Sequence, residues 1–182
     1  SPWDLDSLDF LTQYEIPFIK IPSALLTDLS LIKASAESGK PIILSTGMST
    51  LSEIEEAVQT IKTTNENLEY SILHCNSTYP APHNELNLNL IPIMQEKYGC
   101  VIGYSGHEYD LEPSVIAVAL GAKIIERHIT LDHTMWGTDH KSSLEVHAMD
   151  LLNKRISDIN TMLGSTEKTI TYSEKNVLKK LR

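Results

Sequence analysis

The sequence lacks the features that mark several classes of protein. It has no apolar run approaching the roughly 18 residues that cross a membrane, and no basic-then-apolar leader at its start, which favours the cytosol. It also lacks an excess of positive charge, because 15 Lys and Arg residues against 24 Asp and Glu residues give a net charge of −9. Nucleic acids and acidic membranes bind positive surfaces, so this balance argues against both as partners.

Cysteine is scarce, and a dinucleotide-binding motif is absent. Cys75 closes one apolar run and Cys100 opens the next, so in neighbouring parallel strands they would lie at opposite edges of a sheet, too far apart for a disulfide. Both are predicted to be buried free thiols in a reducing compartment. No Gly-x-Gly-x-x-Gly follows the first predicted strand, which argues against a dinucleotide-binding fold.

Short apolar runs alternate with helical patterns along most of the chain. The predicted strands begin near residues 18, 41, 70, 100 and 123, and regular alternation of this kind predicts a parallel sheet. A closed barrel needs eight strands, whereas this chain has five and a stub at residues 1–3. The predicted fold class is therefore α/β, a partial (β/α)8 TIM barrel over residues 1–164, with roughly strands 4 to 8 and the end of strand 3.

Capping residues and polar stretches predict where helices begin and where long loops lie. The expected caps are Thr27, a capping box from Thr50 to Glu53, and Ser142–Glu145 before a helix over about 144–163. The expected long loops are 76–89 and 130–141. Loops of this length commonly carry function in strand–helix folds.

Polar residues cluster where the predicted strands end. The active sites of (β/α)8 barrels lie at the carboxyl ends of the strands, and here the strand starts are apolar by contrast. In chain order the five strand ends read Lys20-x-x-Ser23, Ser45-Thr46-Gly47, His74-Cys75-Asn76-Ser77-x-Tyr79, Tyr104-Ser105-Gly106-His107 and Glu126-Arg127-His128. All five carry groups that can bind an anion, a metal or a sugar hydroxyl.

The alternation of side chains along a strand predicts which of these groups face one another. If His107 points into the barrel, Ser105 does too, and if His128 points inward, so does Glu126. Two inward imidazoles at adjacent strand ends suit a divalent metal. Lys20 would supply a fixed positive charge for a phosphate or carboxylate, and nearby serines would add neutral donors.

Each of these residues also has an ordinary structural interpretation. A strand-end histidine is more often a satisfied polar residue than a ligand, Lys20 could lie along the rim, and Glu126 with Arg127 could form a structural ion pair. Only their joint placement at one edge favours a site. From the residues alone, a non-catalytic sugar- or anion-binding barrel fragment and a different metal-dependent barrel, such as an aldolase or isomerase, remain alternatives.

The same stretches resemble the N-acetylneuraminate (sialic acid) synthase family, in the family's order and at its spacing. The motifs that carry the resemblance are Ile19–Ser23, Leu44–Met48, Leu73–Cys75 with Tyr79–Pro82, Gly103–His107, Ile125–Leu131, and Gly137–Lys141 with Ser143–Glu145. Together they span nearly the whole chain.

The resemblance implies a transferase that condenses phosphoenolpyruvate with an N-acylated amino sugar of the N-acetylmannosamine type. The products would be a nine-carbon sialic acid and phosphate, with a divalent metal, Mn or Mg, as cofactor; a synthase for legionaminic or pseudaminic acid is the related alternative. The resemblance implies catalytic roles for Lys20, Glu126 and Asp139, and metal ligation by His107 and His128. It implies that phosphoenolpyruvate contacts Lys20, Ser23, Ser45, Ser77 and Ser105, and that the sugar contacts Tyr79 and Asp139.

The sequence departs from the family pattern in four respects. Ser77 stands where some members have Asn, and Gly106 where many have Asp. The family's first strands, which carry an acid and a further phosphate-binding lysine, are not in this sequence, and neither is its small C-terminal antifreeze-like domain, which reaches the partner's active site in a cytoplasmic homodimer. Residues 165–182 are therefore expected to be a linker toward that domain, and the 182 residues to be an excerpt that is inactive alone.

Overall fold

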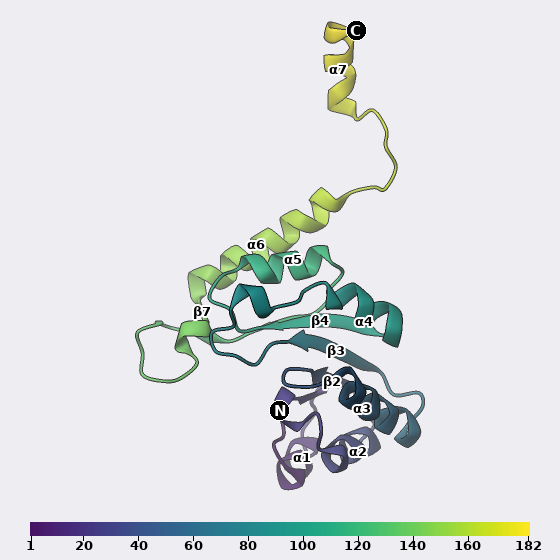
Figure 1. Ribbon diagram of the computed structural model, residues 1–182, viewed down its shortest axis with the longest axis vertical. Helices are drawn as coiled ribbons and strands as arrows, with labels where there is room; N and C mark the ends of the chain where they lie inside the picture. Colours follow the sequence, from purple (N-terminus) through teal and green to yellow (C-terminus); the bar gives the residue numbers. More distant parts are fainter.

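Five parallel strands, joined by helices, form a curled sheet in the computed structural model, which describes residues 1–182 (Figure 1). Each strand pairs with the next one in the sequence, as expected when every connection crosses over through a helix. The strands are β1 (Ile19–Ile21), β2 (Ile42–Ser45), β3 (Tyr70–Cys75), β4 (Val101–Gly106) and β5 (Ile125–Arg127). The predicted partial (β/α)8 barrel is confirmed.

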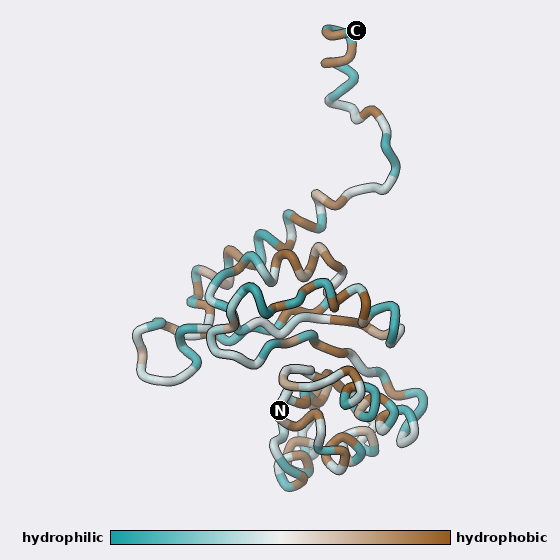
Figure 2. The backbone as a smooth tube through the Cα atoms, viewed as in Figure 1, coloured by the Kyte–Doolittle hydropathy of each residue, from teal (hydrophilic) through white to brown (hydrophobic).

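The helices alternate with these strands and continue beyond the sheet. They are α1 (Leu5–Thr12), α2 (Leu29–Glu37), α3 (Leu51–Thr64), α4 (Leu90–Tyr98), α5 (Glu112–Ala119), α6 (Val146–Leu163) and α7 (Tyr172–Leu181). Figure 1 shows α7 well away from the sheet, at the end of an extended stretch that Figure 2 colours as largely hydrophilic. No helix combines the length and the apolar character needed to cross a bilayer.

The two faces of the sheet differ because side chains alternate along each strand. One face carries apolar residues such as Ile21, Leu44 and Ile102, which belong to a core of 21 buried residues that also includes Ile32, Val58 and Met94 from the helices. The other face carries Lys20, Ser45 and Ser105, which line a cavity. The apolar face therefore anchors the sheet to its helices and leaves the polar face free to form a site.

An ion pair between the two outermost strands of the sheet shows how strongly it is curled. Lys20 Nζ on β1 lies 3.4 Å from Glu126 Oε1 on β5, although three strands separate them in the sheet. In a flat sheet four inter-strand spacings would hold those strands about 19 Å apart, more than the two side chains could span. The curl brings the carboxyl ends of all five strands around one space.

Several predicted boundaries are corrected by contacts that a local pattern does not reveal. Asp28, not Thr27, caps α2, because its carboxylate accepts the backbone N–H of Leu31 at 3.0 Å. Residues 1–3 form no strand. The capping box from Thr50 to Glu53 is confirmed at α3.

The predicted cap at Ser142–Glu145 is wrong, because part of that segment is a strand. Strand β7 (Leu144–Glu145) pairs in parallel with β6 (Ile129–Thr130), so helix α6 begins only at Val146. The backbone N–H of Leu144 donates to the carbonyl of His128 at 2.7 Å. This pairing returns the loop after β5 to the neighbourhood of the sheet's carboxyl edge.

Candidate functional site

A cavity of about 530 Å³ lies at the carboxyl ends of the strands. Its lining contains every residue for which a site role was predicted: Lys20, Ser23, Ser45, Ser77, Tyr79, Ser105, His107, Glu126, His128 and Asp139. It also contains Trp3 and Met48, for which no role was predicted. The curled sheet therefore brings the predicted residues together, while their individual roles stay predictions.

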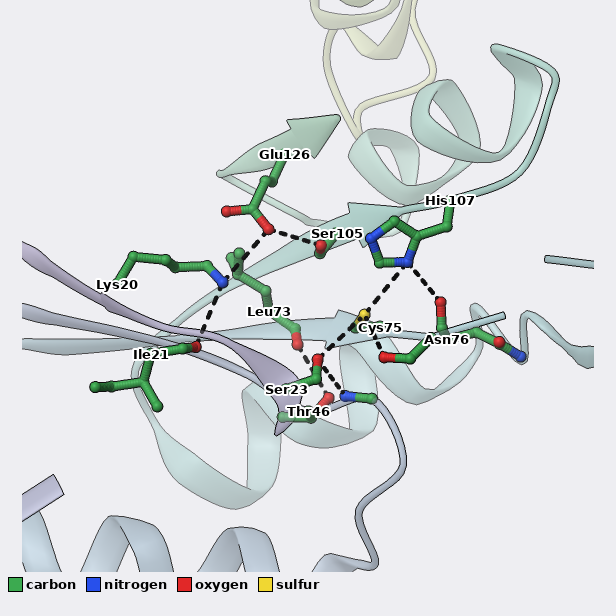
Figure 3. A network of polar contacts seen from close by, with 12 residues as sticks. Lys20, Ile21, Ser23, Thr46, Leu73, Cys75, Asn76, Ser105, His107 and Glu126 are labelled. Carbon is green, nitrogen blue, oxygen red and sulfur yellow. Dashed lines mark hydrogen bonds and ion pairs between the residues drawn. The ribbon is translucent and has the colours of Figure 1, made fainter. Parts of the chain in front are cut away.

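Lys20, Glu126 and Ser105 form a chain of polar contacts across the cavity (Figure 3). Ser105 lies opposite Glu126 in the β4–β5 register, and its hydroxyl donates to Glu126 Oε1 at 2.7 Å. The same oxygen lies 3.4 Å from Lys20 Nζ, and the Lys20 side chain is only 13% exposed. A largely buried ammonium is thus held at the cavity wall by a carboxylate.

The alternative interpretation, a structural ion pair between Glu126 and Arg127, does not hold. Consecutive residues of a strand point to opposite faces, so Arg127 turns away from the cavity and pairs with Glu108 at 3.0 Å. Glu126 is left facing Lys20.

His107 is held with both ring nitrogens engaged. Its Nδ1 lies 2.7 Å from the backbone oxygen of Asn76, and its Nε2 lies 2.9 Å from the hydroxyl of Tyr79. A carbonyl only accepts, so Nδ1 carries the proton in the neutral ring and the Nε2 lone pair accepts the O–H of Tyr79. Burial disfavours the charged imidazole, but the contacts with Cys75 and Asn76 outweigh it and raise the pKa of His107.

His128 lies beside His107, with the two ring centroids 5.2 Å apart. Its Nδ1 is 3.7 Å from Asp139 Oδ2, which comes from the loop after β6. Burial and the neighbouring His107 lower the pKa of His128, although Asp139 and Glu126 oppose the shift. The environment of His128 therefore favours a neutral ring, the form that binds metals.

The two imidazoles fit a divalent metal only as part of its ligand set. An imidazole whose Nδ1–H is bonded to a backbone carbonyl, as in His107, is oriented in the way usual for metal ligands. No group of three or more His, Cys, Asp or Glu residues is arranged to hold a metal ion. An ion bound by His107 and His128 would take its other ligands from water, from substrate, or from protein outside these 182 residues.

The serines of the cavity surround the turn after β2. Ser23 Oγ accepts the backbone N–H of Gly47 at 3.0 Å, and a Cβ on Gly47 would lie only 2.0 Å from Ser77 Oγ, so only glycine fits there. Ser45 is 2% exposed, and its hydroxyl has no hydrogen-bond partner. A buried hydroxyl without a partner at a cavity wall is suited to a ligand that supplies an acceptor.

Cys75 contributes to the site in a way that the sequence analysis missed. It is a free thiol, as predicted, but its Sγ lies 3.5 Å from Ser23 Oγ and 3.8 Å from both Ser77 Oγ and His107 Nδ1. Burial opposes ionisation, yet the contacts with His107, Ser23 and Ser77 lower the pKa of the thiol. Its place in β3 opposite Ser105 was the available signal, because residues in register point to the same face of the sheet. Cys75 contacts residues that line the cavity but does not line it itself.

Tyr79 closes the same side of the cavity above the histidines. Its ring centroid lies 4.1 Å from that of His107 and 5.5 Å from that of His128. Burial and the negative charges of Cys75, Asp139 and Glu126 raise the pKa of Tyr79 to about 12. The hydroxyl therefore stays protonated and acts as a hydrogen-bond donor at neutral pH.

A sequence model described as the NeuB family matches residues 1–168. The chain belongs to the NeuB family. This NeuB chain is 41% identical over 179 residues to the N,N'-diacetyllegionaminic acid synthase of Campylobacter jejuni, covering 97% of this chain and 54% of that protein. It is 40% identical over 159 residues to the N-acetylneuraminate-9-phosphate synthase of Drosophila melanogaster, covering 87% and 42%.

A solved structure agrees with this assignment. The N-acetylneuraminic acid (sialic acid) synthetase of Leptospira borgpetersenii, crystallised in complex with citrate, superposes with a TM-score of 0.89 at 35% identity and covers 98% of this chain and 62% of that one. The NeuB chain spans about half the length of the curated relatives that it matches. The Leptospira synthetase thus shares the fold of this chain.

Proposed function

We propose that this NeuB chain carries part of the active site of a sialic acid-type synthase, which condenses phosphoenolpyruvate with an N-acylated amino sugar. The observation that carries the proposal is a single cavity that combines a buried ammonium, an unpartnered serine hydroxyl and two adjacent imidazoles. An anion and an oxygen-rich sugar need these complementary groups.

Phosphoenolpyruvate would bind on the β1–β2 side of the cavity. Lys20 provides the charge that balances phosphate or carboxylate, and Ser23 and Ser45 provide hydroxyls on the adjacent strand ends. The hydroxyl of Ser45 would gain the acceptor that it lacks. Holding the anion in one orientation lowers the entropic part of the barrier to condensation.

The amino sugar would bind on the β4–β5 side. The Tyr79 hydroxyl donates to His107 Nε2 and would be freed to donate to the sugar when a metal ion takes that nitrogen. Asp139 would accept a hydrogen bond from a sugar hydroxyl. A divalent ion, Mn or Mg, at His107 and His128 would act as a Lewis acid on the sugar aldehyde.

The reaction joins C3 of phosphoenolpyruvate to the aldehyde carbon of the open-chain sugar, and the aldehyde oxygen takes up a proton and becomes a hydroxyl. Water adds to C2, and the C2–O bond to phosphate breaks. Glu126 would accept a proton from that water, because its side chain is 40% exposed and its contacts with Lys20 and Ser105 both use Oε1, which leaves Oε2 for the water. Lys20 would stabilise the departing phosphate.

Two amino sugars are candidates for the second substrate. The relative that is 41% identical is named a legionaminic acid synthase, so a diacetylated amino sugar is the second candidate beside N-acetylmannosamine. We also propose, from the family resemblance, that the full natural protein is a homodimer. Measuring its mass in solution tests this.

The test is phosphate release by the full natural protein with phosphoenolpyruvate, Mn²⁺ and each amino sugar in turn. We expect Lys20→Met to lower kcat/KM at least about 100-fold, because it removes the charge that balances the phosphate. We expect Ser45→Ala to raise the KM for phosphoenolpyruvate. His107→Ala and His128→Ala should abolish stoichiometric Mn²⁺ binding.

Two control variants are matched to these changes. Ser35 on α2 is also a buried serine without a hydrogen-bond partner but lies outside the cavity, so Ser35→Ala should leave KM unchanged. His147→Ala, at an exposed position of α6, should leave Mn²⁺ binding unchanged. The proposal fails if no amino sugar supports phosphate release, or if the His107 and His128 variants bind Mn²⁺ as the parent does.

A further inference from the structure

A buried ion pair lies directly behind the cavity, on the helix-facing side of the sheet. Arg127 NH1 lies 3.0 Å from Glu108 Oε1, and the two side chains are 1% and 0% exposed. Arg127 NH1 also donates to Ser114 Oγ at 3.1 Å, and the hydroxyl of Tyr104 donates to Glu108 Oε2 at 2.8 Å. Neither Arg127 nor Glu108 lines the cavity, so the proposed reaction does not use them directly.

The position of this pair in the chain connects it to the cavity residues. Glu108 immediately follows His107, and Arg127 lies between Glu126 and His128. The ion pair therefore joins the end of β4 to the end of β5 at the points where those strands present their cavity side chains. A shift of either charged side chain would move the backbone that carries the two imidazoles.

Gly106 determines where the Glu108 carboxylate can lie. A Cβ built on Gly106 would stand 2.7 Å from Glu108 Oε1, 2.8 Å from Oε2, and 2.8 Å from Tyr104 Cε1. Real Cβ atoms essentially never come this close, so the carboxylate fills the space that a side chain at position 106 would take. Position 106 also lies opposite Arg127 in the β4–β5 register.

A carboxylate attached at position 106 would reach nearly the same place. From standard bond lengths, the oxygens of an aspartate lie about 2.4 Å from its own Cβ. The Glu108 oxygens stand 2.7 and 2.8 Å from the built Cβ of residue 106, beside Arg127. A carboxylate at position 106 would therefore compete with that of Glu108 for this space, and the Glu108 side chain would have to move.

We infer that Gly106 and Glu108 act as one unit, in which Glu108 is a positioning residue that anchors Arg127 from the space left open by Gly106. The unit holds the ends of β4 and β5 together and thereby sets the relative position of His107 and His128. Its effect on metal binding rests on the proposed function, whereas the coupling of positions 106 and 108 does not.

The inference makes a specific prediction about exchanging the two positions in the full natural protein. Gly106→Asp alone puts two carboxylates into one space, and Glu108→Ala alone leaves a buried guanidinium unpaired. Each is expected to lower Tm by roughly 5–10 °C. The double variant Gly106→Asp/Glu108→Ala restores one carboxylate beside Arg127 but keeps the close approach of the new Cβ to Tyr104 Cε1. About half of the larger single loss should therefore be recovered.

The ring signals of His107 and His128 in NMR spectra give a readout that general stability does not move. These signals should shift in both single variants and return toward the parent positions in the double variant. Mn²⁺ affinity, measured with the ion alone, should fall about tenfold or more in Glu108→Ala and recover in the double variant. If Glu108→Ala fails to fold, folding of the double variant is itself the expected recovery. Glu108→Gln, which removes the charge but keeps the volume, then supplies the ring signals and the Mn²⁺ affinity of a single variant.

Glu112→Ala is the matched control, because Glu112 at the start of α5 pairs with Arg155 of α6 at the surface. It should change neither Tm nor the ring signals. Additive losses of Tm in the double variant, or unchanged ring signals in both Glu108 variants, would overturn the inference. Tm and the ring signals are measured without substrate. If the protein had no synthase activity, the proposed function would be refuted, but the coupling of positions 106 and 108 could still be tested.

Discussion

His74 and His107 end neighbouring strands, yet their surroundings move their pKa values in opposite directions. His74 is buried, and its Nε2–H donates to the carbonyl of Leu86 at 2.7 Å. Burial lowers the pKa of His74, and the bond to Leu86 offsets this only in part. His107 instead gains contacts that stabilise its charged form, and its pKa is raised. His74 therefore anchors the loop after β3 as a neutral ring, while His107 faces the cavity.

We expect acid to destabilise the chain partly through His74. Because its pKa is lower in the folded state than the ordinary value of 6.5, its contribution is complete above about pH 6.5 and is lost as the pH falls below it. One such group changes the slope of unfolding free energy by at most about 1.4 kcal/mol per pH unit. His74→Gln keeps a donor for Leu86 but does not titrate, so its unfolding free energy should fall less steeply between pH 6.5 and 5.

His147→Gln provides the comparison for this experiment. His147 is exposed on α6, and its replacement should reproduce the acid slope of the parent. Denaturant titrations at several pH values measure the slopes. Equal slopes for His74→Gln and the parent would show that His74 does not titrate as described.

At the scale of residues, the sequence predicted which side chains meet but not how they pair. The alternation of side chains put Ser105 with Glu126 and His107 with His128 on one face, and the structure brings them together. The pairing of Arg127 with Glu108 depends on a side chain folding back into the space above Gly106. Such a contact is set by tertiary packing, for which strand periodicity has no signal.

Two identical capping boxes show how much the stability of a helix depends on its packing. Thr50 and Glu53 cap α3, and Thr171 and Glu174 cap α7, with each threonine hydroxyl accepting the N–H of its glutamate. Helix α3 buries Ile54, Ala57, Val58 and Ile61 against the core, whereas α7 buries no residue. The same local motif therefore contributes to global unfolding in one helix only.

This comparison predicts different effects for two equivalent substitutions in the 182-residue chain. Thr50→Ala should lower the free energy of global unfolding by about 1 kcal/mol, the usual cost of losing a helix cap. Thr171→Ala should leave it unchanged and reduce only the helical signal of α7 in circular dichroism. A similar loss of global stability in both variants would mean that α7 packs on the core.

Elements with strong local signals were predictable, and those formed by distant segments were not. The Thr50 box and the strand Tyr70–Cys75 were predicted at their observed positions. Strand β7 was taken for a helix cap, since its partner β6 lies 14 residues or more earlier in the chain. Helix α7 lacks a core-facing pattern, although the Thr171-x-x-Glu174 box was a readable signal.

The whole molecule is an open part of a barrel whose cavity is lined from five strand ends. In the sheet, β1 and β5 each pair with one neighbour, so both present an unpaired edge. The Lys20–Glu126 pair spans the opening between them, and the two imidazoles are not a complete metal ligand set. The relatives that the chain matches are about twice as long.

From these features we predict that residues 1–182 alone release no phosphate from phosphoenolpyruvate and any N-acyl amino sugar, while the full natural protein does. A cavity with one side open to water does not exclude solvent from the reacting atoms, and a metal with two protein ligands is held weakly. A coupled phosphate assay at equal molar concentrations measures the difference, and circular dichroism checks that the shorter chain is folded. The prediction is contradicted if the folded 182-residue chain releases phosphate and its Lys20→Met variant does not. The residues at these five strand ends would then be sufficient for catalysis.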